Sequence, residues 1–213
     1  MIFYLEIVGR ADNDIAPHFG AHGIAMTQAR HFYDQDTLTF TYMVSDPNSG
    51  LAATVDPVLN LDYVSGTLGA RSTDEVLRRV RHQGLSLQYI LETHIHADHL
   101  SSAPHIREQL GGKIVIGTLI TTVKETFAKI FAEGDGFHRY GSQFDLMLSD
   151  GDAFALGDLK VLGFHAPGHT PACMAYLTEG ALFVGDTLFM PDAGTARCDF
   201  PGGDALDRFA SEE

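Results

Sequence analysis

The sequence contains no tryptophan, only two cysteines, half as many basic as acidic residues, and no long apolar stretch. Its cysteines, Cys173 and Cys198, are too few for a disulfide framework and suit a reducing compartment, so we expect a cytoplasmic protein. The 14 Lys and Arg against 28 Asp and Glu give a formal net charge of −14, which disfavours nucleic acid and anionic membranes as partners. No run approaches the roughly 20 apolar residues that a membrane-spanning helix needs.

The length of 213 residues is enough for one globular domain with a sizeable core. The chain opens with the apolar stretch MIFYLEIVG, which is short and contains Glu6, and continues with RADNDIAPHFGAHGIA. This second stretch has two aspartates and a single arginine, whereas a transit peptide is richer in arginine and poorer in acid. We therefore expect residues 1–25 to be an N-terminal extension of low order and residues 26–213 to be the domain.

Hydrophobic periodicity and turn signals predict a mixed α/β fold with hairpins and crossover helices. Strands are expected at 38–46, 51–58, 85–93 and 113–117, and several more, joined by tight glycine-marked turns, between 144 and 190. Helices are expected at 72–84, 101–112 and 118–134, and another begins near the end of the chain. In the first helix, Ser72 and Glu75 form a predicted capping box, and Gly84 suits the C-terminal cap.

A cluster of metal-ligating residue types follows the expected strand at 85–93. The cluster holds three histidines and one aspartate: His94, His96, Asp98 and His99. A loop at the end of a strand can direct several side chains at one point, and imidazole and carboxylate suit first-row transition metals. His169 in APGHTPAC and Asp186 in ALFVGDTLF follow other apolar strands and supply a further histidine and carboxylate. We therefore predict a metal site.

The motifs THIHADH, PGHT and GDTLF, in that order, resemble the metallo-β-lactamase fold superfamily. The resemblance extends from about residue 38 to residue 203. It implies an αββα sandwich, in which two mixed sheets lie face to face with helices outside and metal at one edge of the strands. This fold hosts both hydrolases and redox enzymes, so it does not by itself give a reaction.

The wider segments ETHIHADHLSSA and GDTLFMPDAGTARCDFPGGDA resemble the persulfide dioxygenase branch of that superfamily. The related glyoxalase II enzymes typically have H-x-H-W-D-H, whereas Ala97 stands at the tryptophan position here. TARCDF also lies where those enzymes have a glutamate-bearing segment. Resemblance to the dioxygenase branch implies one Fe(II) ion, with zinc as the alternative, and glutathione persulfide and O2 as substrates, converted to sulfite and glutathione.

The same resemblance implies a role for each candidate residue. His94, His169 and Asp186 would bind the iron. The remaining cluster residues would orient the ligands, hold water and tune the iron: His96, Asp98 and His99. Arg197 would face the carboxylates of the glutathione tail, with Asp199 holding it in place, and Cys198 is either a redox-sensitive thiol or a small packing residue.

Superfamily members usually continue to a last histidine that contacts a second metal, but no histidine follows His169 in this chain. We therefore expect a fold without its C-terminal elements, in a chain that is either truncated or completed by forming a homo-oligomer. Two alternatives to the dioxygenase stay open. One is a glyoxalase II-like thioester hydrolase or another metal-dependent hydrolase, with Asp98 and His99 at a second ion. The other is a relative that binds metal or persulfide without turnover.

Overall fold

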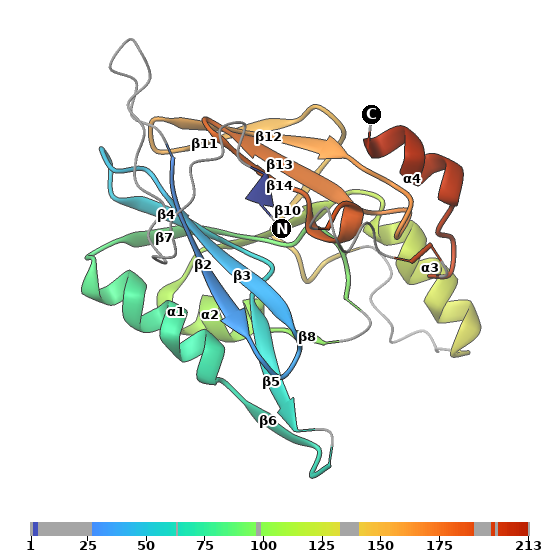
Figure 1. The fold of residues 1–213 in the computed structure, drawn as a ribbon, viewed down its shortest axis with the longest axis horizontal. Helices are drawn as coiled ribbons and strands as arrows, with labels where there is room; N and C mark the ends of the chain where they lie inside the picture. The colour runs from blue at the N-terminus through green and yellow to red at the C-terminus, as the bar shows by residue number, and fades with distance from the viewer. Residues whose placement is uncertain are drawn as a thin grey trace.

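The structure, a computed structural model, describes residues 2–3, 27–62, 64–96, 99–132, 141–189, 197–198 and 200–212. Two β-sheets pack face to face, and helices lie outside them (Figure 1). The predicted α/β class and two-sheet sandwich are therefore confirmed. No helix in these ranges is both long and apolar enough to cross a membrane.

The first sheet has six strands in the order β10-β9-β7-β4-β3-β2. Their bounds are β2 Gln28–Asp34, β3 Thr39–Ser45, β4 Leu51–Val55, β7 Ser86–Leu91, β9 Lys113–Gly117 and β10 Leu146–Leu148. Strands β2, β3 and β4 pair antiparallel with one another. Strands β4, β7, β9 and β10 pair in parallel. The carboxyl ends of these parallel strands therefore meet at one edge of the sheet.

The second sheet has five antiparallel strands in the order β1-β14-β13-β12-β11. Their bounds are β1 Ile2–Phe3, β11 Ala153–Leu156, β12 Leu159–His165, β13 Met174–Thr178 and β14 Ala181–Phe183. β1 falls within the expected N-terminal extension and pairs with β14, while residues 4–25 lie outside the described ranges. A third, small sheet has the order β6-β5-β8, with β5 Val58–Asp62, β6 Thr67–Gly69 and β8 Leu100–Ser101.

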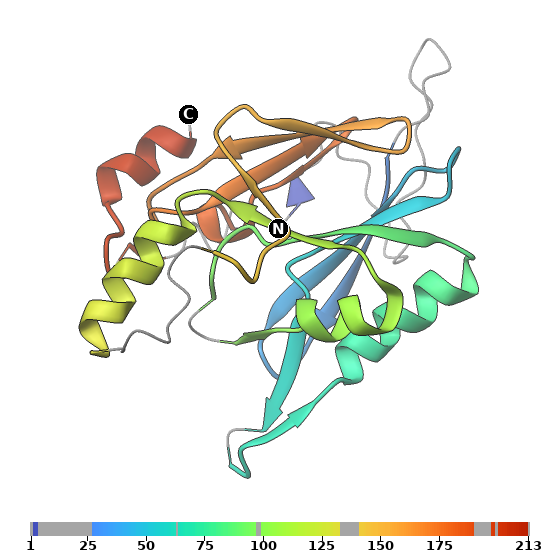
Figure 2. The same ribbon diagram turned by 180° about the vertical axis from the view of Figure 1, so that it is seen from behind.

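The main core lies between the two large sheets. Val55 and Val115 of the first sheet and Tyr176 and Phe183 of the second belong to one buried apolar cluster. Helices α1 (Arg71–His82) and α2 (Ala103–Leu110) cover the other face of the first sheet, as Figure 2 shows from behind. Burial on both faces explains why β7 and β9 are nearly continuous apolar runs.

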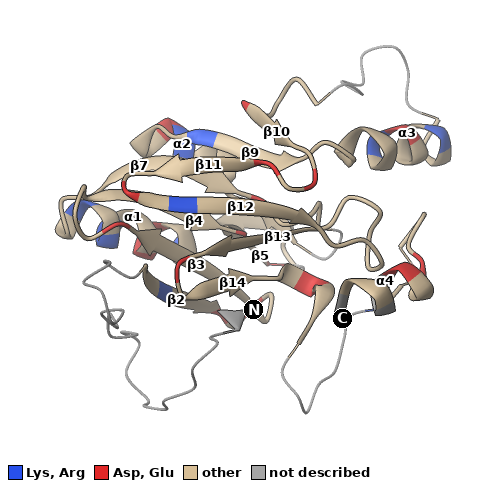
Figure 3. Ribbon diagram, turned by 90° about the horizontal axis from the view of Figure 1, so that it is seen from above, with Lys and Arg blue, Asp and Glu red and all other residues tan. Residues whose placement is uncertain are grey.

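Helix α3 (Ile120–Ile130) follows β9, and helix α4 (Ala205–Glu212) contacts the 3-10 turn η1 (Gly185–Thr187). Figure 3 shows that α1, α2 and α3 carry many of the basic residues: Arg71, Arg78, Arg79, Arg81, Arg107, Lys124 and Lys129. Most positive charge in the described ranges therefore lies on these helices rather than on the second sheet.

The start of α1 differs from the prediction. Its N-cap residue is Ala70, and no side chain caps the helix, so the predicted box of Ser72 and Glu75 is wrong. The Ser72 hydroxyl instead donates a short hydrogen bond to the buried carboxylate of Asp34 at the end of β2. Because the helix begins at Arg71, Ser72 lies inside its first turn and is not the N-cap residue. At the other end, Gly84 has φ +64°, as its predicted role requires.

Candidate metal centre

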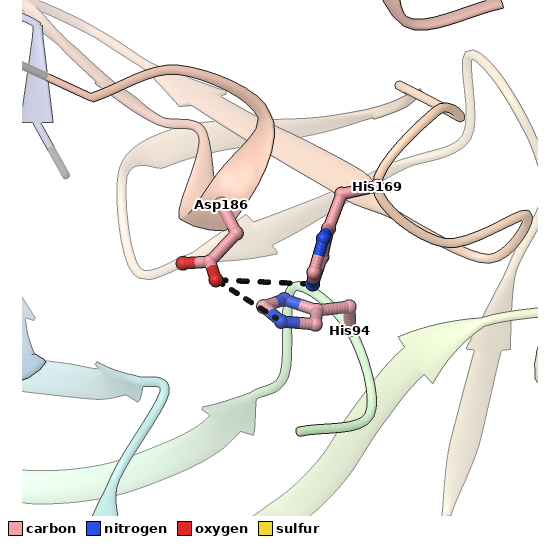
Figure 4. Close-up of side chains that lie close together, drawn as sticks. All are labelled: His94, His169 and Asp186. Atoms are coloured by element: carbon pink, nitrogen blue, oxygen red, sulfur yellow. Dashed lines mark ion pairs between the residues drawn. The ribbon is translucent and has the colours of Figure 1, made fainter. Parts of the chain in front are cut away.

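Three predicted ligands converge at one end of the sandwich. His94 follows β7, His169 lies between β12 and β13, and Asp186 lies in η1 (Figure 4). Asp186 Oδ2 is 3.9 Å from His94 Nε2 and 3.8 Å from His169 Nε2. Ligand atoms bonded to one transition-metal ion lie about 3–3.5 Å apart, so these two distances would shorten by less than about 1 Å on binding it.

Thr93 fixes the tautomer of His94. Thr93 Oγ1 donates to Asp56 Oδ2 at 2.7 Å and lies 3.0 Å from His94 Nδ1. Because its only proton goes to the carboxylate, the hydroxyl must accept from His94 Nδ1–H. The lone pair of the ring is then on Nε2, which is buried and has no hydrogen-bond partner in the described part of the chain. A buried nitrogen with a free lone pair fits a metal ligand.

The tautomer of His169 is fixed by the backbone of Arg197. His169 Nδ1 lies 2.7 Å from the Arg197 carbonyl oxygen, which can only accept, so Nδ1 carries the proton. Both histidines therefore present Nε2 lone pairs toward Asp186. Two imidazole nitrogens and one carboxylate form a ligand set that leaves other positions of an ion open. The residues present fit a bound transition-metal ion.

His96 does not join these three ligands. Its Nε2 lies 3.5 Å from Asp56 Oδ1 and 3.8 Å from Glu92 Oε2, and these three side chains form a second group whose possible ligand atoms lie within 4.8 Å of one another. The two carboxylates were not predicted, because a single acid beside a strand resembles an ordinary turn residue. The available signal was their position: Asp56 follows β4 and Glu92 follows β7, so parallel pairing brings them to one sheet edge.

Burial and neighbouring charges set the pKa values of these groups. Burial, followed by repulsion from His96 and His169, holds the pKa of His94 well below its ordinary value. Burial alone would lower the pKa of His96, but Asp56 and Glu92 raise it to about 9. Burial and the Asp56 charge raise the pKa of Glu92 to about 8. Near neutral pH, His94 is therefore neutral, while His96 is a cation between two carboxyl groups.

Burial would also raise the pKa of Asp56, but contact with His96 and two hydrogen bonds from Thr93 lower it below its ordinary value. Asp56 adopts a left-handed backbone conformation, with φ +47°. A non-glycine residue rarely adopts this conformation, and here it places the carboxylate against Thr93 and His96 at once.

Gly185 allows η1 to approach Thr93. A Cβ atom at this glycine would lie 2.2 Å from Thr93 Oγ1, and its φ of +52° favours glycine. Because Asp186 is the next residue, the close approach sets its carboxylate beside the two ligand histidines. The sequence GD is common in turns after strands, but here the glycine is needed for the close approach that positions Asp186.

The other predicted residues are placed as follows. The His99 ring is buried and stacks on His96, with ring centroids 4.1 Å apart. Arg197 contributes its carbonyl to His169, and its side chain is exposed. Asp98 and Asp199 lie outside the described residues, so their roles stay predictions.

Comparisons with known proteins agree with this geometry. A family model described as the Metallo-beta-lactamase superfamily matches residues 38–213. A "Probable metallo-hydrolase" of Burkholderia pseudomallei is 48% identical over 190 residues, which are 84% of this chain and 65% of that protein. The mitochondrial persulfide dioxygenase ETHE1 of Homo sapiens is 29% identical over 177 residues, which are 82% of this chain and 57% of that protein.

Among solved structures, ETHE1 from Myxococcus xanthus matches with a TM-score of 0.67 and 26% identity, covering 86% of this chain and 67% of that one. The matched region spans only 40% to 65% of the length of several curated relatives.

Proposed function

We propose a function for this chain on the premise that it belongs to the metallo-β-lactamase superfamily. Within the superfamily, we infer that it is a persulfide dioxygenase, which uses one iron(II) ion and O2 to oxidise glutathione persulfide. The observation that carries the proposal is the group of His94, His169 and Asp186, whose ligand atoms all lie within 4.8 Å of one another. Two histidines and one carboxylate are the ligand set of non-haem iron oxygenases.

His96 lies outside this ligand set. Its Nε2 faces Asp56 and Glu92, so the set keeps two histidines and one carboxylate. The structure of ETHE1 from Myxococcus xanthus, similar over 86% of this chain, supports the same branch.

Iron, when bound, supplies the redox chemistry that zinc lacks. One O2 and one water convert one persulfide into one thiol, one sulfite and two protons, so the outer sulfur is oxidised and O2 is fully reduced. His94 is buried, whereas the side chains of His169 and Asp186 are 18% and 33% exposed. Substrate therefore approaches from the side of these two residues, where Arg197 can attract the carboxylates of a glutathione tail.

The alternative is a metal-dependent hydrolase, such as a glutathione thioester hydrolase. The name of the 48% identical relative, a probable metallo-hydrolase, favours it. In that case Asp98 and His99 would hold a second ion, and the metal centre would supply activated water for hydrolysis of the thioester.

The test combines metal analysis with two activity assays on the 213-residue chain. We expect one iron per chain and consumption of one O2 per glutathione persulfide. Asp186→Asn should lose both iron and O2 uptake, whereas Asp207→Asn, an exposed change on α4, should lose neither. Two zinc ions per chain, with hydrolysis of S-lactoylglutathione and no O2 uptake, would instead establish the hydrolase.

A further inference from the structure

A cavity of about 340 Å³ lies behind the loop that carries His94. It is bounded by this loop, by the start of α2 and by β9, the elements seen from behind in Figure 2. Its walls are mainly apolar: Ile95, Leu100, Pro104, Ile114, Ile116 and Phe144. Cavities of this size with apolar walls and a few polar groups are typical binding sites for small organic molecules.

One buried carboxyl oxygen in this cavity has no hydrogen-bond partner within the described ranges. The Glu92 side chain is 5% exposed and lines the cavity. Its Oε1 accepts a short hydrogen bond from Ser101, whereas its Oε2 has no partner there. The nearby His96 Nε2 is 3.8 Å away, beyond hydrogen-bonding distance. An unsatisfied buried polar atom costs about 1–3 kcal/mol, which a hydroxyl group of a ligand could recover.

The cavity adjoins the metal-ligating group on one side. His94, His96 and His99 form part of its wall, but His169 and Asp186 are not among its described lining residues. Arg107, at 42% side-chain exposure, also lines it and pairs with Asp145 at 3.2 Å.

We propose that this cavity is a second binding site, for a small organic molecule with an apolar, ring-sized body and one hydroxyl group. The apolar body packs against the isoleucines and Phe144, and the hydroxyl group forms a hydrogen bond with Glu92 Oε2. Binding requires neither turnover nor a metal, so the site is independent of the dioxygenase proposal.

Two matched probes test the proposal by ¹⁹F NMR titration. 4-Fluorophenol has the apolar ring and one donor, and 4-fluorotoluene has the ring without the donor. We expect the phenol to bind more tightly by on the order of tenfold, the effect of one hydrogen bond. In Glu92→Leu this preference should fall to near unity, while the toluene still binds.

Two tryptophan variants locate the probe. Leu100→Trp, on β8 in the cavity wall, should weaken binding of both probes by on the order of tenfold, because the indole occupies part of the cavity. Leu68→Trp, at a similarly exposed position on β6 of the same small sheet, should leave binding unchanged. The proposal is overturned if neither probe binds at millimolar concentration, if the wild-type protein binds both equally, or if the tryptophan variants behave alike.

Discussion

Replacing Thr93 by valine should loosen the metal centre without changing a ligand. Valine has nearly the shape of threonine but lacks the hydroxyl that donates to Asp56 and accepts from His94 Nδ1. The change leaves a buried carboxylate oxygen and a buried ring N–H each without a partner, at about 1–3 kcal/mol each. We therefore expect a loss of about 2–6 kcal/mol in the free energy of unfolding. Metal affinity should fall about 10- to 100-fold, because His94 loses its orienting bond.

Thr93→Ser is the matched control. It keeps the hydroxyl and removes one buried methyl group, so it should cost about 1 kcal/mol and change metal affinity little. Urea unfolding of the metal-free protein gives the first quantity, and competition with a chromophoric chelator gives the Kd for Zn²⁺. If the valine and serine variants bind Zn²⁺ equally well, the hydroxyl does not orient His94 and the assigned tautomer loses its support.

Three further predictions concern individual stabilising contacts. Burial alone would raise the pKa of Asp46, but the hydrogen bonds that its carboxylate accepts hold the pKa below its ordinary value. The ionised carboxylate therefore contributes to the free energy of unfolding above about pH 4, and this contribution is lost as the pH falls further. Asp46→Asn should cost about 1–3 kcal/mol in urea unfolding at pH 7 and less at pH 3, and an equal cost at both would contradict this. Gly185→Ala places a Cβ atom against Thr93, so it should lower the free energy of unfolding by more than about 2 kcal/mol and weaken Zn²⁺ binding. The control Gly50→Ala, at φ +71° with no atom near its Cβ position, should cost only about 1 kcal/mol. Equal losses in the two variants would refute the close approach. Tyr176→Phe removes a buried bond to the Glu92 carbonyl and should lower stability by about 1 kcal/mol while sparing metal affinity, and a large loss of affinity would show that this bond also positions the metal loop.

The sequence was most informative where side chains lie next to one another along the chain. The cluster beginning at His94 could be recognised because several ligand types follow one strand. Asp186 could be added because the motifs occur in a characteristic order. Asp56 could not be found in this way, because its role depends on β4 pairing in parallel with β7, more than 30 residues further along the chain.

The local capping rule failed at the start of α1. The sequence S-x-x-E predicts a capping box at Ser72, but the helix begins earlier, at Arg71, and the Ser72 hydroxyl donates to Asp34. Asp34 also accepts hydrogen bonds from the turn after β2, so satisfying this one carboxylate organises several segments. A rule based on neighbouring residues does not include the contact between Ser72 and Asp34, which are 38 positions apart.

The left-handed conformation of Asp56 links the metal centre to the folding of the whole sandwich. Holding a non-glycine residue at φ +47° costs about 1–2 kcal/mol, which two hydrogen bonds from Thr93 offset. Thr93 in turn orients His94, while the other two ligands come from the second-sheet side, after β12 and after β14. An ion that binds all three therefore joins the two sheets, and any affinity for the folded form adds to stability as RT ln(1 + [metal]/Kd). Metal affinity and unfolding free energy should consequently fall together in variants of Asp56 and Thr93, since the same bonds determine both.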